Sequence, residues 1–419
     1  MRGLRVSRTI NANIQNQINT SIIFHYISEN EPVYRAKIAE SLGISAPAVS
    51  RVIESLISDG FVVETGVAPT ERGRKAAELR INTARGTVIA VDLIKERTRI
   101  AACDFRGKIV ERFSGFKLSD TSRLERELIS SIDHLLPSRR SGTVGGGAKL
   151  SAIAVGVPAA TGTAPSALHI STSLYAGLEG LDFVHTLGSR YGVPVYVENV
   201  VKLSALAEMN SGAARNCSDV VFVEVSNGIG AGIIVDGHVY RGASGASGEL
   251  GFTLLGGESL AYRPSNKGWL EDRASMEGIT RRASEAMTQG TSLMGDLCSH
   301  DPGRLTPSMV CQAALQGDSA ALRIVTETVE YLSLAIVNLI LILNPQIVVL
   351  GGDLCRLPGL EELFVSPIRA AAGRSVPFAA PPIAVSALGE DAGILGASRL
   401  AIDSLLTSRF PYKLSSSPS

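Results

Sequence analysis

The sequence predicts a mixed α/β chain in two parts: an N-terminal helix-turn-helix with a β-hairpin, and a larger domain made of two similar halves. Three observations support this prediction. Between residues 35 and 66, apolar residues recur at helical spacing around Gly43. Two runs of strand, polar turn and strand begin near residues 86 and 219. Helical sequence follows each run, which indicates a duplicated α/β domain with a cleft between its halves.

The overall composition sets limits on the class of protein. The chain has 419 residues and 45% hydrophobic content, enough for more than one domain with its own core. Lys plus Arg and Asp plus Glu number 40 each, so no global charge points to nucleic acid or a membrane. The five cysteines lie far apart without a Cys-x-x-Cys pair, which favours reduced thiols in the cytoplasm over a disulfide or metal framework.

No segment is expected to leave the cytoplasm or to cross a membrane. The N-terminus lacks the apolar core of a signal peptide. The most apolar run, Leu332 to Leu343, is shorter than the roughly 20 residues that a membrane span needs. We therefore expect a buried helix there and a cytoplasmic protein.

Residues 35–66 carry the most specific pattern in the chain. A helical face is predicted for the apolar residues Ile38, Ala39, Leu42, Val49, Val52, Ile53 and Leu56. Gly43 stands where a sharp turn between two short helices is needed. Ser45 is suited to capping the second helix, and Pro47 suits its first turn. This is the pattern of a helix-turn-helix, whose second helix enters the major groove of DNA.

A winged hairpin is expected after the second helix. Gly60 ends the helix, Phe61 to Thr65 alternate as a strand, and residues 66–81 form a turn and a returning strand. Cationic side chains stand at the tip of this wing, in reach of phosphates or the minor groove: Arg72, Arg74 and Lys75. A further basic arm is expected at the extreme N-terminus, where Arg2, Arg5 and Arg8 precede the first acidic residue.

Double-stranded operator DNA is the partner that this module predicts. The outer face of the second helix is small, polar and cationic, as a major groove requires. We assign DNA contacts there to Ser45, Ala46, Pro47, Ser50 and Arg51, and on the wing to Arg72, Arg74 and Lys75. The alternative is a winged helix that contacts only protein, with its arginines solvated.

The larger domain is expected to span residues 86–406, after a winged-helix domain at 1–82 and before a disordered tail at 407–419. In its second half, Ser226 to Ile233 form a glycine-rich turn whose backbone amides are suited to phosphate. Glycines serve tight hairpins as well, so this signal alone is weak.

Motifs throughout the chain resemble those of the ROK family of repressors and sugar kinases. They are Ala-Val-Asp-Leu at 90–93, Val-Gly-Val-Pro at 155–158, Val-Glu-Asn at 197–199, Gly-Ile-Gly-Ala-Gly at 228–232, Gly-Glu-Leu-Gly at 248–251 and Val-Leu-Gly-Gly at 349–352. The resemblance implies a duplicated actin-like (ribonuclease H-like) ATPase fold. With a winged helix in front, the chain is similar to the family's repressors of the xylose and N-acetylglucosamine type.

Two departures from the family pattern argue against an enzyme. Kinases of the family have Gly-Gly-Thr in the first phosphate loop, where this chain has Ile94, Lys95 and Glu96. They also have an aspartate as general base after the Glu-Asn pair, where this chain has Val200. A side chain without lone pairs cannot accept a proton. We therefore expect no catalytic residue; the alternative is a sugar kinase with an accessory DNA-binding domain.

No metal or cofactor is expected. The family's zinc site uses a His and three Cys, and the corresponding positions here hold Phe252 and, nearby, Tyr262, Pro264 and Trp269. These side chains offer no thiolate or imidazole to zinc. Apolar packing is expected to hold the loop instead.

A sugar-like effector is the small-molecule partner that the resemblance implies. Asn199, Glu249 and Glu271 match family residues that bind sugar hydroxyls, whereas Val200 and Phe252 do not. The alternative is that these polar residues only tie down loops in a domain kept for assembly. A homo-oligomer, dimer or tetramer, is expected in either case.

Overall fold

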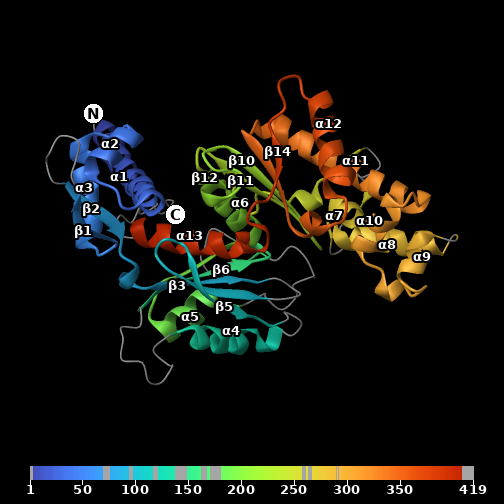
Figure 1. Cartoon of the computed structure of the whole chain (residues 1–419), viewed down its shortest axis with the longest axis horizontal. Helices are drawn as coiled ribbons and strands as arrows, with labels where there is room; N and C mark the ends of the chain where they lie inside the picture. Colours follow the sequence, from blue (N-terminus) through green and yellow to red (C-terminus); the bar gives the residue numbers. More distant parts are fainter. Residues whose placement is uncertain are drawn as a thin grey trace.

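The computed structural model describes residues 3–68, 76–93, 98–116, 121–136, 149–161, 168–169, 181–256, 261–262, 267–288, 290 and 292–407. These residues form an N-terminal module and two lobes on either side of a pair of packed helices (Figure 1). Each lobe has a five-stranded sheet, in the orders β5-β4-β3-β6-β9 and β12-β11-β10-β13-β14. In both, an antiparallel meander continues into two parallel strands. The predicted duplicated α/β fold is confirmed.

The N-terminal module contains the predicted helix-turn-helix. Its elements are α1 (Gly3–Asn30), α2 (Arg35–Leu42), α3 (Ala46–Ser58), β1 (Val62–Ala68) and β2 (Ala76–Ile81). Gly43 ends α2 with a φ of 64°, the left-handed conformation that glycine adopts without strain. Pro47 lies in the first turn of α3. Ser45 precedes α3, but its side chain makes no capping hydrogen bond, contrary to the prediction; its backbone carbonyl accepts from the amides of Ala48 and Val49 instead.

The ends of this module differ from the sequence expectation. The expected basic arm is part of a 28-residue helix, α1, which contains Arg5 and Arg8. Strand β1 continues to Ala68, beyond the expected end at Thr65, because Val67 and Ala68 still pair with β2. The wing tip with Arg72, Arg74 and Lys75 lies outside the described residues, as does the tail from residue 408.

The first lobe comprises β3 (Thr87–Asp92), β4 (Arg99–Cys103), β5 (Ile109–Ser114), α4 (Thr121–Leu135), β6 (Leu150–Val157), β7 (Ala160–Thr161), β8 (Leu168–His169), α5 (Phe183–Tyr191) and β9 (Val195–Asn199). One face of its sheet packs on α4 and α5 through Leu124, Leu128 and Leu187. The other face packs on α13 (Ala392–Thr407), the last helix of the chain.

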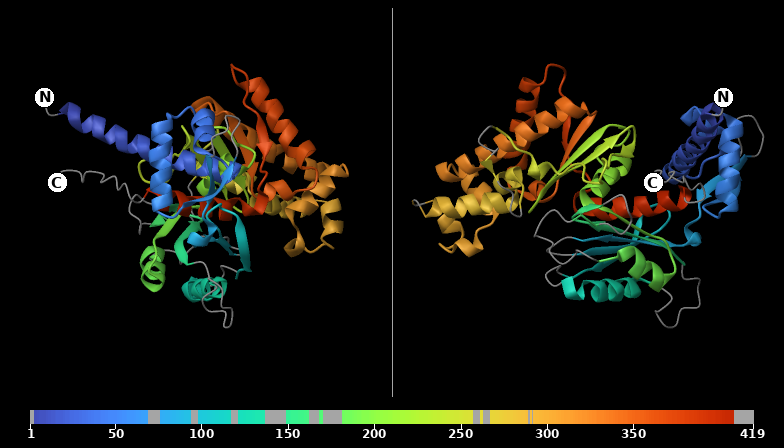
Figure 2. Two further views of the ribbon diagram at one scale, coloured as in Figure 1. Left: turned by 60° about the vertical axis from the view of Figure 1, so that its left-hand side comes forward. Right: turned by 180° about the vertical axis from the view of Figure 1, so that it is seen from behind.

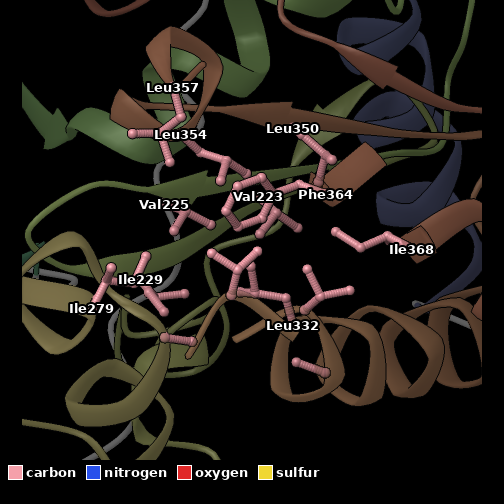
Figure 3. Packing of buried hydrophobic residues seen from close by; sticks show 14 of the residues in the cluster. Val223, Val225, Ile229, Ile279, Leu332, Leu350, Leu354, Leu357, Phe364 and Ile368 are labelled. Carbon is pink, nitrogen blue, oxygen red and sulfur yellow. The ribbon is translucent and has the colours of Figure 1, made fainter. Parts of the chain in front are cut away.

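The second lobe comprises β10 (Val220–Val225), β11 (Ile229–Val235), β12 (His238–Val239), α7 (Trp269–Ala274), α8 (Met276–Met287), α9 (Leu293–Leu297), α10 (Pro307–Leu315), α11 (Ser319–Leu343), β13 (Ile347–Gly351), α12 (Ser366–Ser375) and β14 (Ile383–Val385). Figure 3 shows its core, in which Val223 and Leu350 of the sheet meet Leu332 of α11 and Ile368 of α12.

Helix α11 corrects the expectation of a short apolar segment. The run from Leu332 to Leu343 is the second half of a 25-residue helix that begins at Ser319. Among the described residues, α11 is long and apolar enough by composition to cross a membrane, and 56% of its most apolar window is buried in the lobe. This partial burial is the behaviour of a core helix in a globular lobe.

Two helices fill the space between the sheets. Helix α6 (Val200–Ser211) packs on the second sheet, and α13 packs on the first. Their backbones meet closely, because a Cβ at Gly396 would lie 2.0 Å from the carbonyl oxygen of Leu203. Likewise, a Cβ at Gly232 would lie 2.5 Å from the Cβ of Ala205. The glycine-rich motif at 228–232 thus serves close helix–sheet packing.

The N-terminal module shares its core with the first lobe. One cluster of buried residues joins Ile23, Phe24 and Ile27 of α1 to Ile402 and Leu406 of α13. His25 contacts the Asp403 carboxylate at 2.6 Å, and Ser21 donates to the same oxygen at 3.2 Å. Figure 2 shows α1 crossing the end of α13, with its N-terminal half extending away from both lobes.

Candidate functional site

The outer face of α3 presents the residues predicted to contact DNA. Ser45, Ala46, Pro47 and Arg51 are exposed, and Ser50 is half-buried. The opposite face holds the buried residues Val49, Val52, Ile53 and Leu56. Arg51 has no hydrogen-bond or ion-pair partner among the described residues. The structure therefore brings these five positions together on one open surface, where a cationic side chain is available to a polyanion.

A second candidate site is a cleft of about 800 Å³ between the lobes. It lies at the carboxyl ends of the parallel strands, where α/β sheets usually bind ligands. Its wall includes the ends of β3 and β9, the first turns of α6 and α13, and the turns after β10 and β13. The cleft brings together Asn199, Glu249 and Glu271, the three residues predicted to bind an effector.

Asn199 ends β9 and caps α6. Its side-chain oxygen accepts from the amides of Val201 at 2.9 Å and Lys202 at 3.2 Å, and its Nδ2 donates to the carbonyl of Ala159 at 3.1 Å. This amide therefore fixes the start of the helix that lines the cleft. Its neighbour Glu198 accepts from Thr161 at 3.0 Å and from Arg241 Nε at 2.6 Å, which anchors the same strand end.

Glu271 joins two loops of the second lobe beside the cleft. Its carboxylate accepts from the amides of Ile229 at 3.1 Å and Gly268 at 3.2 Å, and the side chain is only 4% exposed. Burial raises its pKa, and these two backbone donors oppose that shift. Glu249 precedes the turn Leu250–Phe252 and lines the same wall, half-buried. Asn199 and Glu271 thus have structural partners, which is consistent with a loop-fixing role as well as ligand contact.

Val200 is the residue that the sequence comparison placed at the expected position of a kinase base. It opens α6 and lines the cleft with 8% of its surface exposed. Its Cγ2 would lie 3.1 Å from a Cβ at Gly393, so it packs against the start of α13. Ile94, Lys95 and Glu96, the other departure from the kinase pattern, lie outside the described residues.

The cleft is also lined by two carboxyls from the sheets, Asp92 and Glu224. From the sequence, Asp92 was included only within a family motif, and Glu224 was not identified. Burial raises the pKa of Asp92 to about 7, opposed by Arg99. Burial, and then the charge of Asp92, raise the pKa of Glu224 to about 7. A glutamate inside the apolar strand sequence of β10 was the available signal, because strand interiors rarely carry an isolated acid.

The residues at the family's zinc positions do not fit a metal ion. Trp269 is 2% exposed, meets Tyr331 edge-to-face at 5.4 Å, and lies under Arg273. Phe252 is half-buried on the cleft wall, and Pro264 lies outside the described residues. No three His, Cys, Asp or Glu side chains are grouped for a metal in the described part of the chain. The aromatic contacts of Trp269 hold this region in place.

Comparisons with known proteins establish the family. A family model described as "ROK family" matches residues 88–404. The chain therefore belongs to the ROK family. It is 27% identical over 405 residues to the xylose repressor of Caldicellulosiruptor bescii, covering 95% of this chain and 98% of that protein.

Two solved structures share the fold. One is a ROK family transcriptional regulator, a homologue of the Escherichia coli MLC protein, with a TM-score of 0.75 and 22% identity over 94% of this chain and 98% of that one. The other is a ROK family glucokinase from Streptomyces griseus in complex with glucose and AMPPNP. Its TM-score is 0.60 at 21% identity, and it covers 75% of this chain and 99% of its own.

Proposed function

We propose that this chain is a DNA-binding transcriptional regulator of the ROK family, acting as a repressor. The coverage of its relatives carries this proposal. The xylose repressor aligns with 95% of the chain, whereas the glucokinase, almost complete, aligns with 75%. A regulator accounts for the additional N-terminal module, in which α3 presents Arg51 and its neighbours on an open face.

The DNA site of this regulator is an inverted repeat read by a homo-oligomer. The lobes provide assembly, dimer or tetramer, and two α3 helices on a two-fold axis occupy half-sites about one helical turn apart or a multiple of it. Arg72, Arg74 and Lys75 on the wing supply phosphate or minor-groove contacts. The regulator acts in the cytoplasm, and it binds no membrane.

The cleft binds a sugar or a related polyol and has no kinase activity. Asn199, Glu249 and Glu271 supply hydrogen-bonding groups on its wall, and Val200 supplies no base. A ligand that favours one arrangement of the lobes shifts the spacing of two α3 helices and thereby DNA affinity. Xylose, the sugar named for one relative, is a first ligand to test.

Selection of bound sequences from random double-stranded DNA, followed by affinity measurements at several salt concentrations, tests this function. The full-length chain is expected to enrich an inverted repeat. Equal affinity for all DNA sequences, or no DNA binding at all, would reject the proposed regulator in favour of a winged helix that contacts only protein.

The response to effector is tested on the selected DNA. Glu249→Ala is expected to lose the response to a sugar that releases the wild-type protein from DNA, with DNA affinity in the absence of sugar as the reference. A normal response in this variant rejects the assignment of the cleft as the effector-binding site.

The alternative, a sugar kinase with an accessory DNA-binding domain, requires ATP-dependent phosphorylation. Purified protein is expected to phosphorylate no hexose or pentose. Activity that a substitution in the cleft abolishes would favour the kinase.

A further inference from the structure

The cleft wall contains a buried carboxylate whose hydrogen bonding is incomplete within the described part of the chain. Asp92 ends β3 on the cleft wall, and its side chain is 2% exposed. Its Oδ1 is buried and has no hydrogen-bond partner among the residues that the structure describes. Its Oδ2 lies 3.7 Å from Arg99, longer than a normal hydrogen bond. A buried acceptor without a donor costs free energy, which a ligand hydroxyl or amino group would recover.

Glu224 approaches the same space from the other lobe. It lies on β10, the strand of the second lobe that corresponds to β3, and also lines the cleft. The two carboxyls interact electrostatically, because the charge of Asp92 raises the pKa of Glu224, whereas the neighbouring Ser226 hydroxyl lowers it. Ser226 accepts from the amide of Asp353 at 3.1 Å, which ties the turn that follows β10 to the turn that follows β13. Two electrostatically coupled carboxyls, one from each lobe, therefore line the cleft.

The charges of the described residues that line this space are predominantly negative. Among the described residues that line the cleft, the ionisable acids are Asp92, Glu224, Glu249, Glu271, Asp353 and Glu390, and the cations are Arg99 and Arg356. Both arginines are already paired with the same carboxylate, that of Glu390. Arg99 lies 3.1 Å from Glu390, and Arg356 binds its other oxygen. A phosphate group entering here meets acids and finds both of these guanidiniums engaged.

Hydroxyl groups are better hydrogen-bond partners for the carboxyls of Asp92 and Glu224 than phosphates are. Because burial raises the pKa of Asp92 and of Glu224 to about 7, each carboxyl is partly protonated near neutral pH. Each side chain is then able both to donate and to accept a hydrogen bond. A sugar hydroxyl also donates and accepts, whereas a phosphate dianion only accepts.

We propose that Asp92 and Glu224 form a subsite for hydroxyl or amino groups of an uncharged or cationic polyol, and that this subsite excludes phosphorylated ligands. The subsite rests on the proposed function, because it defines which sugars act as effectors.

Matched pairs of ligands test the exclusion of phosphate. Calorimetric titration of the full-length protein compares xylose, glucose, N-acetylglucosamine and glucosamine with their phosphate esters. At least one parent sugar is expected to bind, and its ester is expected to bind at least about tenfold more weakly, because like charges repel in the cleft. An ester that binds as tightly as its parent sugar overturns the subsite.

A double variant tests the two carboxyls directly. Asp92→Asn with Glu224→Gln keeps the side-chain shapes but removes the charges. The double variant is expected to bind the parent sugar about tenfold more weakly, or weaker still. The matched control is Glu330→Gln on the exposed side of α11, which is expected to bind as the wild type does. Unchanged affinity of the double variant for the parent sugar overturns the subsite.

The outcomes separate this inference from the proposed function. If a phosphate ester binds best and releases the protein from DNA, the regulator stands and the subsite is wrong. If no ligand of the panel binds or alters DNA affinity, the effector role is rejected and the subsite with it. Magnesium ATP serves as an additional polyanionic probe, and a Kd below about 1 mM would also overturn the exclusion of phosphate.

Discussion

The outer face of α3 and the interlobe cleft use polar side chains in opposite ways. On α3, Ser45 and Arg51 are exposed, and Arg51 has no partner among the described residues. In the cleft, Asn199 and Glu271 are fixed by hydrogen bonds from backbone amides. A surface for a long polyanion gains from accessible cations, whereas a pocket for a small ligand gains from groups held in place beforehand. The predictions below test this contrast.

The largest effect is expected at the α3 surface. Arg51→Ala should weaken operator binding by ~1–3 kcal/mol if the guanidinium contacts a base, and should relax specificity at that position. The measurement is operator affinity against single-base variants of the site. Arg323→Ala, an exposed arginine on α11, is the control and should leave affinity unchanged. If Arg51→Ala and Arg323→Ala bind the operator with equal affinity, Arg51 and the α3 surface are not part of the DNA interface.

A comparable effect, on stability, is expected where the N-terminal module meets α13. Burial alone would raise the pKa of Asp403, but Arg399 and His25 hold it well below its usual range. Asp403→Ala leaves both partners without their carboxylate and should lower the free energy of unfolding by about 2–3 kcal/mol. Denaturant titration measures this loss. A loss no greater than that of the surface variant Glu330→Gln would mean that the interface contributes little.

The shared core also affects truncation experiments. Removing the residues before Gly86 uncovers Ile402 and Leu406 of α13, which pack with α1. Such a fragment should bind no operator, and it should unfold at a lower temperature than the intact chain because apolar surface becomes exposed. Point variants on α3 are therefore the cleaner test of DNA binding.

A smaller effect is expected from the pH dependence of the cleft. The folded pKa values of Asp92 and Glu224, about 7, lie above their ordinary values of 3.8 and 4.5. The folded state therefore binds these protons more tightly, and this stabilisation is complete below about pH 4 and is lost as the pH rises through about 7. Asp92→Asn with Glu224→Gln should flatten the decline in melting temperature between about pH 5 and pH 8, by about 2–5 °C. Parallel profiles for variant and wild type would contradict the raised pKa values.

The smallest effect, a null result, is expected for an attempt to restore a kinase. Val200→Asp supplies the missing carboxylate, but the neighbouring cleft still contains Asp92 and Glu224, which oppose a polyphosphate. The variant should therefore show no ATP-dependent sugar phosphorylation in a coupled assay, although a general base is worth about 10²–10⁴-fold in rate. Detectable turnover would show that the cleft still accepts a nucleotide.

The amino-acid sequence determined the local and periodic features. Helical spacing of apolar residues around Gly43 was sufficient for α2 and α3, because a left-handed turn residue and an amphipathic face are encoded within a few positions. The repeated strand pattern likewise indicated two lobes with one topology. The prediction that Val200 replaces a base also came from the sequence, since the absence of a lone pair on a side chain requires no coordinates.

Only the tertiary structure decided how distant segments combine. No local pattern indicates that α13, the last helix, joins the N-terminal module to the first lobe through Asp403 and His25. The raised pKa of Glu224 became visible only when the fold placed it in the same cleft as Asp92, because a carboxyl's pKa depends on burial and on charges from other elements. The roles of Asn199 and Glu271 as anchors of loops also depend on backbone amides that the fold brings to them. Long-range packing and desolvation, which no short stretch of sequence encodes, set these features.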